Sequence, residues 1–176
     1  MNIKPLMRRT VFHIIRTRQF NDKCIKQFAK TIHNKKILEL GSGKRIRGKC
    51  KYSSKKFFDK SNKFICSDIN KKFGHNVIDA TKMKLNKEFD VVLCLSVLEH
   101  IFDFEKAVKN IYNALKTSGM AVIFVPGFYP LHEEPNDYWR FTEHSLKKIL
   151  KDFKKVNIRT FGIRQYPFGY YIEARR

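Results

Sequence analysis

Short apolar runs alternate with amphipathic stretches along most of this chain. The runs are rich in Ile, Leu, Val and Phe and have the length of buried strands, whereas apolar residues three and four positions apart are typical of helices. The predicted strands cover residues 36–40, 63–67, 76–78, 89–95, 119–125, 156–161 and 168–173, the last two as a hairpin-like pair. Because strands alternate with helices, the pattern predicts an α/β fold: a mostly parallel, seven-stranded sheet with helices on both faces.

Two helices are predicted before the first strand. Residues 5–18 form a basic amphipathic helix with an apolar face made of Leu6, Met7, Val11, Ile14 and Ile15. A second helix begins after the candidate cap Asn21 and carries a stripe made of Ile25, Phe28, Ala29 and Ile32. We expect this N-terminal helical segment, residues 1–34, to pack on or cover a pocket of the main domain, residues 35–176. The alternative is a lid, or peripheral contact of residues 5–18 with a membrane surface.

Two further helices are predicted in the second half of the chain. The first covers residues 103–116 and ends at Gly119 as a left-handed terminator. The second is capped by Thr142 and extends to about Phe153. By contrast, residues 44–62 are rich in Lys and Ser and have little helical periodicity, so no regular helix is expected there.

Length and cysteine content narrow the class of protein. With 176 residues, 43% of them hydrophobic, the chain fits one domain with a sizeable core. No run is long enough to span a bilayer, and the N-terminus lacks the apolar stretch of a signal peptide. The cysteines at positions 24, 50, 66 and 94 show no Cys-x-x-Cys spacing. They are interpreted as free thiols in a reducing, cytoplasmic compartment, neither disulfide partners nor zinc ligands.

The formal net charge of +21 at pH 7 is unusually high. Clustered Lys and Arg attract phosphate, so a nucleic-acid partner or an anionic membrane is one interpretation. Compositional bias of the genome is the other, because 26 of the 37 basic residues are lysines and all of them are spread along the chain. The second interpretation is favoured.

The segment Ile37–Gly43 carries the strongest functional signal. An apolar run leads into Glu39-x-Gly41-x-Gly43, a strand followed by a glycine turn, where backbone N–H groups can approach a ligand closely. A second apolar run ends in Asp68, and a carboxylate there can accept hydrogen bonds from a ribose diol. A dinucleotide fingerprint would need a third glycine where Ile46 stands, so hydride transfer is disfavoured. The pattern indicates a different nucleoside ligand.

These motifs resemble those of class I S-adenosylmethionine (SAM)-dependent methyltransferases. Segments 37–43, 66–69, 77–80, 89–100 and 114–119 follow one another as they do in that family. Segment 130–142 is similar to the His-x-x-Pro-x-Asp-Tyr-x-Arg-(Phe/Tyr)-Thr signature of its methyltransferase-11-like branch. The resemblance covers residues 35–160 and implies a Rossmann-like fold with SAM as cofactor. Arg45 departs from it, because many members have a further glycine at that position.

The resemblance also implies which residues bind the cofactor. Gly41, Ser42 and Gly43 would lie under its methionine part, with Glu39 ordering the turn or meeting the ligand amine through water. Asp68 would bind the ribose, while Ile69, Asp79 and Ala80 would surround the adenine. Residues at the end of the central strand, Cys94, Leu95 and Ser96, would face the sulfonium.

Candidate catalytic and acceptor-binding residues follow the fourth and fifth predicted strands. His100 and His132 are candidates for removing a proton from the acceptor. Some relatives bind a divalent metal through Glu-x-x-Glu-His, but Ser96 occupies the first position here, so no metal is predicted. Acceptor binding is assigned to His132, Asp137, Tyr138, Trp139 and Arg140. The alternative is that Trp139 and Phe141 are core anchors for the following helix and that Asp137 and Arg140 form an internal ion pair.

The sequence therefore predicts a cytoplasmic methyltransferase that moves a methyl group from SAM to a small-molecule or glycan-precursor acceptor, by O- or N-methylation. An RNA acceptor, suggested by the net charge, is one alternative. A non-catalytic binding module with the same fold is another.

Overall fold

The computed structural model describes residues 4–48, 50 and 52–176, with side chains from Phe12 onward. Its strands are β1 (Lys36–Leu40), β2 (Lys63–Asp68), β3 (Asn76–Val77), β4 (Phe89–Leu95), β5 (Leu115–Pro126), β6 (Lys155–Ile163) and β7 (Tyr166–Arg175). Its α-helices are α1 (Lys4–Ala29), α2 (Phe104–Ala114) and α3 (Glu143–Ile149), with short 3₁₀ helices at Ser54–Phe57, Lys71–Phe73 and Leu98–His100.

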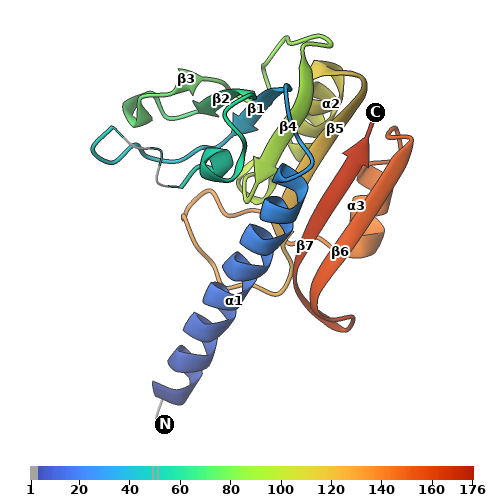
Figure 1. Cartoon of the computed structure of the whole chain (residues 1–176). Coiled ribbons are helices and arrows are strands. Elements are labelled where there is room, and N and C mark those ends of the chain that lie inside the picture. Colours follow the sequence, from blue (N-terminus) through green and yellow to red (C-terminus); the bar gives the residue numbers. More distant parts are fainter. Residues whose placement is uncertain (1–3, 49, 51) are drawn as a thin grey trace.

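All seven strands form one sheet in the order β3-β2-β1-β4-β5-β7-β6 (Figure 1). The first five are parallel to their neighbours, and β7 inserts antiparallel between β5 and β6. The predicted α/β fold and the hairpin of the last two strands are therefore confirmed. The strand order reverses between β1 and β4, and ligands of open α/β sheets bind at such a point, beyond the carboxyl ends of the strands.

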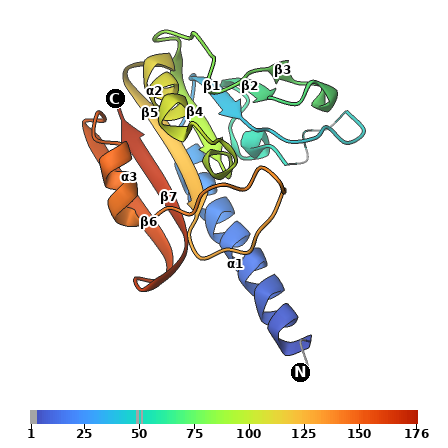
Figure 2. The same ribbon diagram turned by 180° about the vertical axis from the view of Figure 1, so that it is seen from behind.

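Alternating side chains of the central strands build a core on each face of the sheet. In β4, Val91 and Leu93 belong to the core under α1, whereas Val92 and Cys94 belong to the core under α2 and α3. Figures 1 and 2 show α1 on one face and the other two helices on the opposite face. This explains why the β4 sequence is almost continuously apolar: both of its faces are buried.

The N-terminal region is one helix, not the two predicted. The sequence between the two expected helices contains neither Gly nor Pro to interrupt α1, and Asn21 lies inside it instead of capping it. From Thr17 onward, buried positions such as Ile25 and Phe28 pack on the sheet. The expected face shared by Leu6, Met7 and Val11 falls outside the described side chains. In the described part of the chain, no helix combines the length and apolar character needed to span a membrane.

The helix predicted over 103–116 ends two residues early, because Leu115 already begins β5. Leu115 is fully buried and pairs with Phe89 of β4. The left-handed residue near this junction is Ser118, with φ of 68°, and not Gly119. Gly119 is required for a different reason, since a Cβ there would lie 2.9 Å from the Lys116 carbonyl oxygen.

The helix α3 begins as predicted and ends before Phe153. Its cap residue Thr142 accepts a hydrogen bond from the Ser145 backbone N–H, and the Ser145 hydroxyl oxygen accepts one from the Thr142 N–H. This reciprocal arrangement is a capping box. The helix ends at Ile149, and the following turn carries Phe153 into the core.

Candidate active site

A cavity of about 290 Å³ lies at the carboxyl ends of β1, β4 and β5. From the sheet side it is lined by Glu39, Leu40, Gly41, Leu95, Ser96, Glu99, Phe124, Pro126, Tyr129 and His132. From the opposite side it is lined by Ile14, Thr17, Arg18, Asn21 and Asp22 of α1, together with Tyr52, Ser54, Lys56 and Phe57. The cavity therefore lies where ligands of open α/β sheets bind.

The glycine turn after β1 has the backbone that only glycine adopts readily. Gly41 and Gly43 have φ of +69° and +70°. A Cβ on Gly41 would lie 2.5 Å from a methyl carbon of Val97, and one on Gly43 would lie 3.1 Å from Cβ of Tyr52. Both positions therefore need glycine, for conformation and for space.

Glu39 is the centre of a buried hydrogen-bond network that orders this turn. Its carboxylate accepts hydrogen bonds from the Ser42 hydroxyl at 2.7 Å, the Ser53 hydroxyl at 2.5 Å and the Ser54 backbone N–H at 2.7 Å. The described part of segment 44–62 contains no α-helix, only the 3₁₀ helix Ser54–Phe57. The absence of a regular helix matches the prediction, and Glu39 ties the start of this short element to β1.

Asp68, at the end of β2, lies beside the glycine turn. One carboxylate oxygen accepts the Gly43 N–H at 3.0 Å, and the other accepts the Asn70 N–H at 2.9 Å. Asp79 follows β3 and accepts two hydrogen bonds from Thr81, which lower its pKa although burial opposes them. Ile69 is exposed. The predicted ribose and adenine residues thus follow the ends of neighbouring strands, outside the cavity lining.

Of the residues predicted at the end of β4, the structure brings two to the cavity. Leu95 and Ser96 line it, and Ser96 adopts a left-handed φ of 54°. The Cys94 side chain points to the other face of the sheet, where it is fully buried in the core. Burial raises the pKa of the Cys94 thiol, so it stays protonated.

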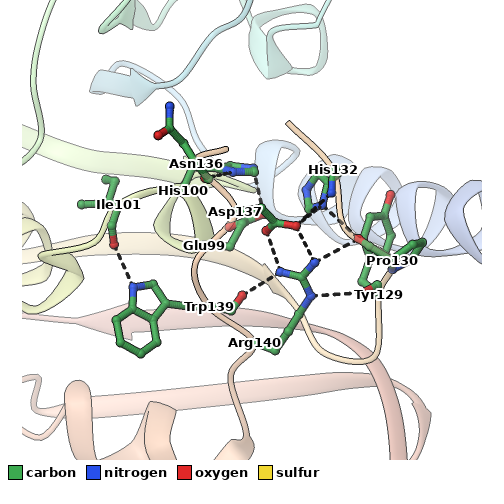
Figure 3. A network of polar contacts seen from close by, with 10 residues as sticks. All are labelled: Glu99, His100, Ile101, Tyr129, Pro130, His132, Asn136, Asp137, Trp139 and Arg140. Atoms are coloured by element: carbon green, nitrogen blue, oxygen red, sulfur yellow. Dashed lines mark hydrogen bonds and ion pairs between the residues drawn. The ribbon is translucent and has the colours of Figure 1, made fainter. Parts of the chain in front are cut away.

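His132 is held by Asp137 at the edge of the cavity (Figure 3). Nδ1 of His132 lies 3.2 Å from an Asp137 carboxylate oxygen and 3.2 Å from the Pro130 carbonyl oxygen. The same carboxylate accepts the backbone N–H of His132 at 2.9 Å. Because both neighbours of Nδ1 are acceptors, the proton of a neutral imidazole resides there. The lone pair is then on Nε2, as a general base requires.

Arg140 fixes the other side of Asp137 and uses all five of its N–H donors within the protein. Its two terminal nitrogens each lie 2.7 Å from one oxygen of Asp137. The remaining donors bind the carbonyl oxygens of Tyr129, Pro130 and Trp139. The guanidinium holds the pKa of Asp137 well below its usual range, against the effect of burial. The internal ion pair, the alternative interpretation of these residues, is thus present.

Trp139 and Tyr138 do not line the cavity. The Trp139 indole N–H lies 3.2 Å from each of the carbonyl oxygens of Ile101 and Phe102, and the ring packs edge-on against Phe104 at 5.1 Å. Tyr138 is exposed and donates its hydroxyl to Asn136. Trp139 is therefore partly buried against the core and Phe141 is fully part of it, in line with the alternative interpretation that both are core anchors.

Glu99 is the feature of the site that sequence reasoning did not assign. It is fully buried, lines the cavity, and neither carboxylate oxygen has a hydrogen-bond partner among the described residues. Burial raises its pKa to about 8. His100 lies beside it, with Nε2 4.0 Å from Glu99 and Nδ1 2.8 Å from the Asn136 carbonyl oxygen. The sequence shows that Glu99 and His100 are neighbours, but it does not show that Glu99 is buried.

The contribution of α1 was also not assigned at the level of residues. Arg18 and Asp22 bring opposite charges to the cavity wall, and the Arg18 guanidinium lies 5.7 Å from the Tyr52 ring centroid. Their four-residue spacing places both on one helix face. That spacing is a signal available from sequence, but the direction of the face became known only from the fold.

Two groups of described side chains bring three potential metal ligands within 4.8 Å of one another. One is Glu99, His100 and His132, at the cavity. The other is Cys50, Cys66 and His75, beside the glycine turn. The prediction that no metal binds rested on spacing along the sequence, whereas both groups form only on folding.

Comparisons with known proteins agree with the fold. An Archaeoglobus fulgidus SAM-dependent methyltransferase matches with a TM-score of 0.66 and 19% identity over 90% of this chain and 94% of that one. A Burkholderia thailandensis 1,6-didemethyltoxoflavin-N1-methyltransferase, solved with its substrate and S-adenosylhomocysteine, matches with a TM-score of 0.63 and 17% identity over 89% and 78%. The fold is thus the Rossmann-like methyltransferase fold. These comparisons do not support a nucleic-acid partner.

Sequence comparisons give the family. Ubiquinone biosynthesis O-methyltransferase of Rickettsia canadensis (strain McKiel) is 38% identical over 42 residues, and this chain spans only 18% of the length of that protein. The methyltransferase-11-like branch stays a prediction. A family profile described as a methyltransferase domain matches residues 11–154, most of the chain. The chain therefore belongs to the methyltransferase-domain family.

Proposed function

We propose that this protein is a SAM-dependent methyltransferase that acts on an oxygen or nitrogen of a small-molecule or glycan-precursor acceptor. One observation carries the proposal. The cavity at the carboxyl ends of β1 and β4 has the glycine turn at one side and His132, oriented by Asp137, at another. The glycine turn proposed for the cofactor and the proposed base therefore line the same cavity.

The cofactor would bind along the ends of the first four strands. Gly41, Ser42 and Gly43 would lie under its methionine part, and the hydrogen bonds to Glu39 would hold the turn in place. Asp68 would accept the ribose hydroxyls with lone pairs left after its two backbone contacts. Ile69, Asp79 and Ala80 would surround the adenine, and Leu95 and Ser96 would face the sulfonium.

The N-terminal helical segment, residues 1–34, would complete the cofactor pocket. The lining of the cavity by α1 supports this proposal. Arg18 is the cation on that wall that suits a ligand carboxylate, and Asp22 is an anion that suits an ammonium group. A methionine moiety carries both groups, so the two side chains match its charges.

His132 would serve as the general base. Asp137 keeps the proton on Nδ1 and thereby leaves the Nε2 lone pair available. When bound, SAM would supply an activated methyl group: the bond between the acceptor atom and the methyl carbon would form as the sulfur–carbon bond breaks, with S-adenosylhomocysteine as the leaving group. His132 would take the acceptor proton on Nε2, and α1, which lines the cavity, would limit the access of water. His100, which lies edge-on to His132 with ring centroids 4.8 Å apart, would support its ring.

Isothermal titration with SAM, S-adenosylhomocysteine and NADH tests the cofactor. We expect micromolar binding of the two adenosyl ligands and none of NADH. Asp68→Ala should weaken the binding of S-adenosylhomocysteine at least about tenfold, because hydrogen bonds to a charged group are lost. Asp59→Ala is the control, since Asp59 is an exposed carboxylate that does not line the cavity.

If neither SAM nor S-adenosylhomocysteine binds, the proposal is contradicted and a non-catalytic module is favoured. If they bind, a screen of hydroxyl- and amine-bearing small molecules, with S-adenosylhomocysteine release as the readout, tests catalysis. Activity on one such class that His132→Ala removes, with cofactor affinity retained, is the expected result. Activity that survives His132→Ala would remove the base assignment.

A further inference from the structure

Two thiols and an imidazole meet behind the glycine turn. Sγ of Cys50, Sγ of Cys66 and a ring nitrogen of His75 all lie within 4.8 Å of one another. The three residues come from separate segments: the loop after β1, the strand β2 and the residue before β3. None of the three side chains is assigned a role in the proposed cofactor site.

The histidine in this group has one ring nitrogen to spare. Nε2 of His75 lies 2.8 Å from the Gly43 carbonyl oxygen, an acceptor, so Nε2 carries the proton. Nδ1 is then the lone-pair atom, and it is buried with no hydrogen-bond partner among the described residues. A buried lone pair without a partner is costly in a folded protein. A metal ion on Nδ1 would satisfy it, with the Gly43 carbonyl as the outer-shell contact that orients the ring.

The surroundings of the two thiols also suit a metal ion. Cys66 is buried, and its sulfur lies 3.6 Å from the Ser53 hydroxyl oxygen, within hydrogen-bonding reach. A divalent ion displaces the thiol protons when it binds, because its charge compensates the thiolates. Cys50, half-buried, leaves the site open to solvent.

We propose that Cys50, Cys66 and His75 bind a thiophilic divalent cation, of which zinc is the expected one. Two sulfur ligands and one imidazole are a donor set that zinc prefers, with water in the fourth position of a tetrahedron. Binding replaces two S–H bonds by two metal–sulfur bonds and releases two protons. No oxidation takes place.

The position of this site gives it a structural role. The loop after the glycine turn lacks the support of a regular helix, and only the 3₁₀ helix Ser54–Phe57 follows it. The metal joins this loop, at Cys50, to the neighbouring strand at Cys66. It also fixes His75, which holds the Gly43 carbonyl. The ion therefore orders the turn that the proposed cofactor needs.

Metal titration of the full, untagged chain tests the site. We expect one Zn²⁺ per chain by mass spectrometry of the metal content. Addition of Co²⁺ to the metal-free, reduced protein should produce near-ultraviolet sulfur-to-cobalt charge-transfer bands. Cys50→Ser and His75→Ala should each weaken Co²⁺ binding by more than the roughly 100-fold that loss of an outer-shell contact costs. Zn²⁺ should raise the melting temperature of the unaltered chain but not those of Cys50→Ser and His75→Ala.

Matched controls are Cys24→Ser, a buried thiol outside the group, and His33→Ala, an exposed histidine. Both should bind Co²⁺ as the unaltered chain does, and circular dichroism checks that each variant folds. No charge-transfer bands, undiminished binding by Cys50→Ser and His75→Ala, or a native Cys50–Cys66 disulfide would each overturn the proposal. No adenosyl ligand is used, so the result does not depend on the proposed function.

Discussion

Asp137 and Arg140 form a two-pronged ion pair in which each carboxylate oxygen lies 2.7 Å from a different guanidinium nitrogen. Asp137 in turn binds His132, so the arginine, the carboxylate and the imidazole form one connected unit. The arginine also binds the backbone on both sides of His132, at Pro130 and Trp139. The orientation of the proposed base thus depends on a residue that does not itself line the cavity.

Arg140→Lys should uncouple this unit. An ammonium group cannot reproduce the planar fork, so at least two of the five hydrogen bonds are lost, at a cost on the order of 2 kcal/mol in the free energy of unfolding. Methyl transfer should fall mainly in kcat, because His132 is misoriented. Arg159→Lys is the control: Arg159 pairs with Glu173 at 2.8 Å and does not line the cavity. Equal losses of activity in the two variants would contradict the assignment.

Glu99→Gln should change how stability depends on pH. The pKa of Glu99 is raised to about 8, so the folded chain holds this proton to higher pH than the unfolded chain does. Stability from this group is full below the unfolded pKa and is lost as pH rises through about 8. Between about pH 5 and about pH 9, the free energy of unfolding of the unaltered chain should therefore fall by on the order of 3 kcal/mol relative to that of Glu99→Gln. Urea unfolding measures this.

The partly exposed Glu88 provides the control for that experiment. Glu88→Gln should give a pH profile parallel to that of the unaltered chain. If the Glu99→Gln profile is also parallel, then Glu99 is ionised in the folded protein and the burial argument fails.

Gly41→Ala should disrupt the glycine turn in two separable ways. The left-handed backbone costs a residue with a Cβ about 1–2 kcal/mol, and the contact with Val97 adds a steric penalty. Gly48→Ala isolates the first effect, because Gly48 has φ of +75° and open space around its Cβ position. Only Gly41→Ala should lose S-adenosylhomocysteine affinity, and adding Val97→Ala should restore part of it. Failure of that rescue would show that the steric contact is unimportant.

Arg18→Ala should weaken the binding of S-adenosylhomocysteine by about tenfold, since the cation on the cavity wall that we propose for the ligand carboxylate is lost. The effect should shrink at high salt. Arg16→Ala removes the same charge from the same helix, at an exposed position outside the cavity lining. Calorimetric affinities that fall equally in the two variants would indicate a general charge effect and not a contact.

The strands were predictable because a strand that is buried on both faces has an almost continuously apolar sequence. In β4, every position from Val91 to Cys94 is buried, and the predicted and observed bounds coincide. Element ends were less predictable, because tertiary pairing decides them. Leu115 fits a helix by its spacing, yet its pairing with Phe89 places it in β5.

Part of the cavity lining was named from the sequence, through the glycine turn and the end of the central strand. Gly41 and Ser96 line the cavity, and both have the left-handed conformation that such turns use. The sequence could not show that Cys94 faces away, because a one-residue change of register reverses the face. Nor could it show that Glu99 lacks a partner. That is a property of the surroundings, which come from several distant segments.

The docking of α1 on β7 has a consequence for the order of folding during synthesis. Gln27 accepts a hydrogen bond from Arg159 of the adjacent strand β6, 132 positions later, and His13 stacks on Phe168 of β7 at 4.4 Å. The ribosome therefore synthesises α1 long before β7, against which α1 packs. Contacts between segments so distant in sequence form late in folding. Until β7 emerges, the apolar stripe of α1 has no complete docking surface. We expect nascent chains arrested before β7 to be crosslinked to chaperones through α1, and chains that include β7 to escape them.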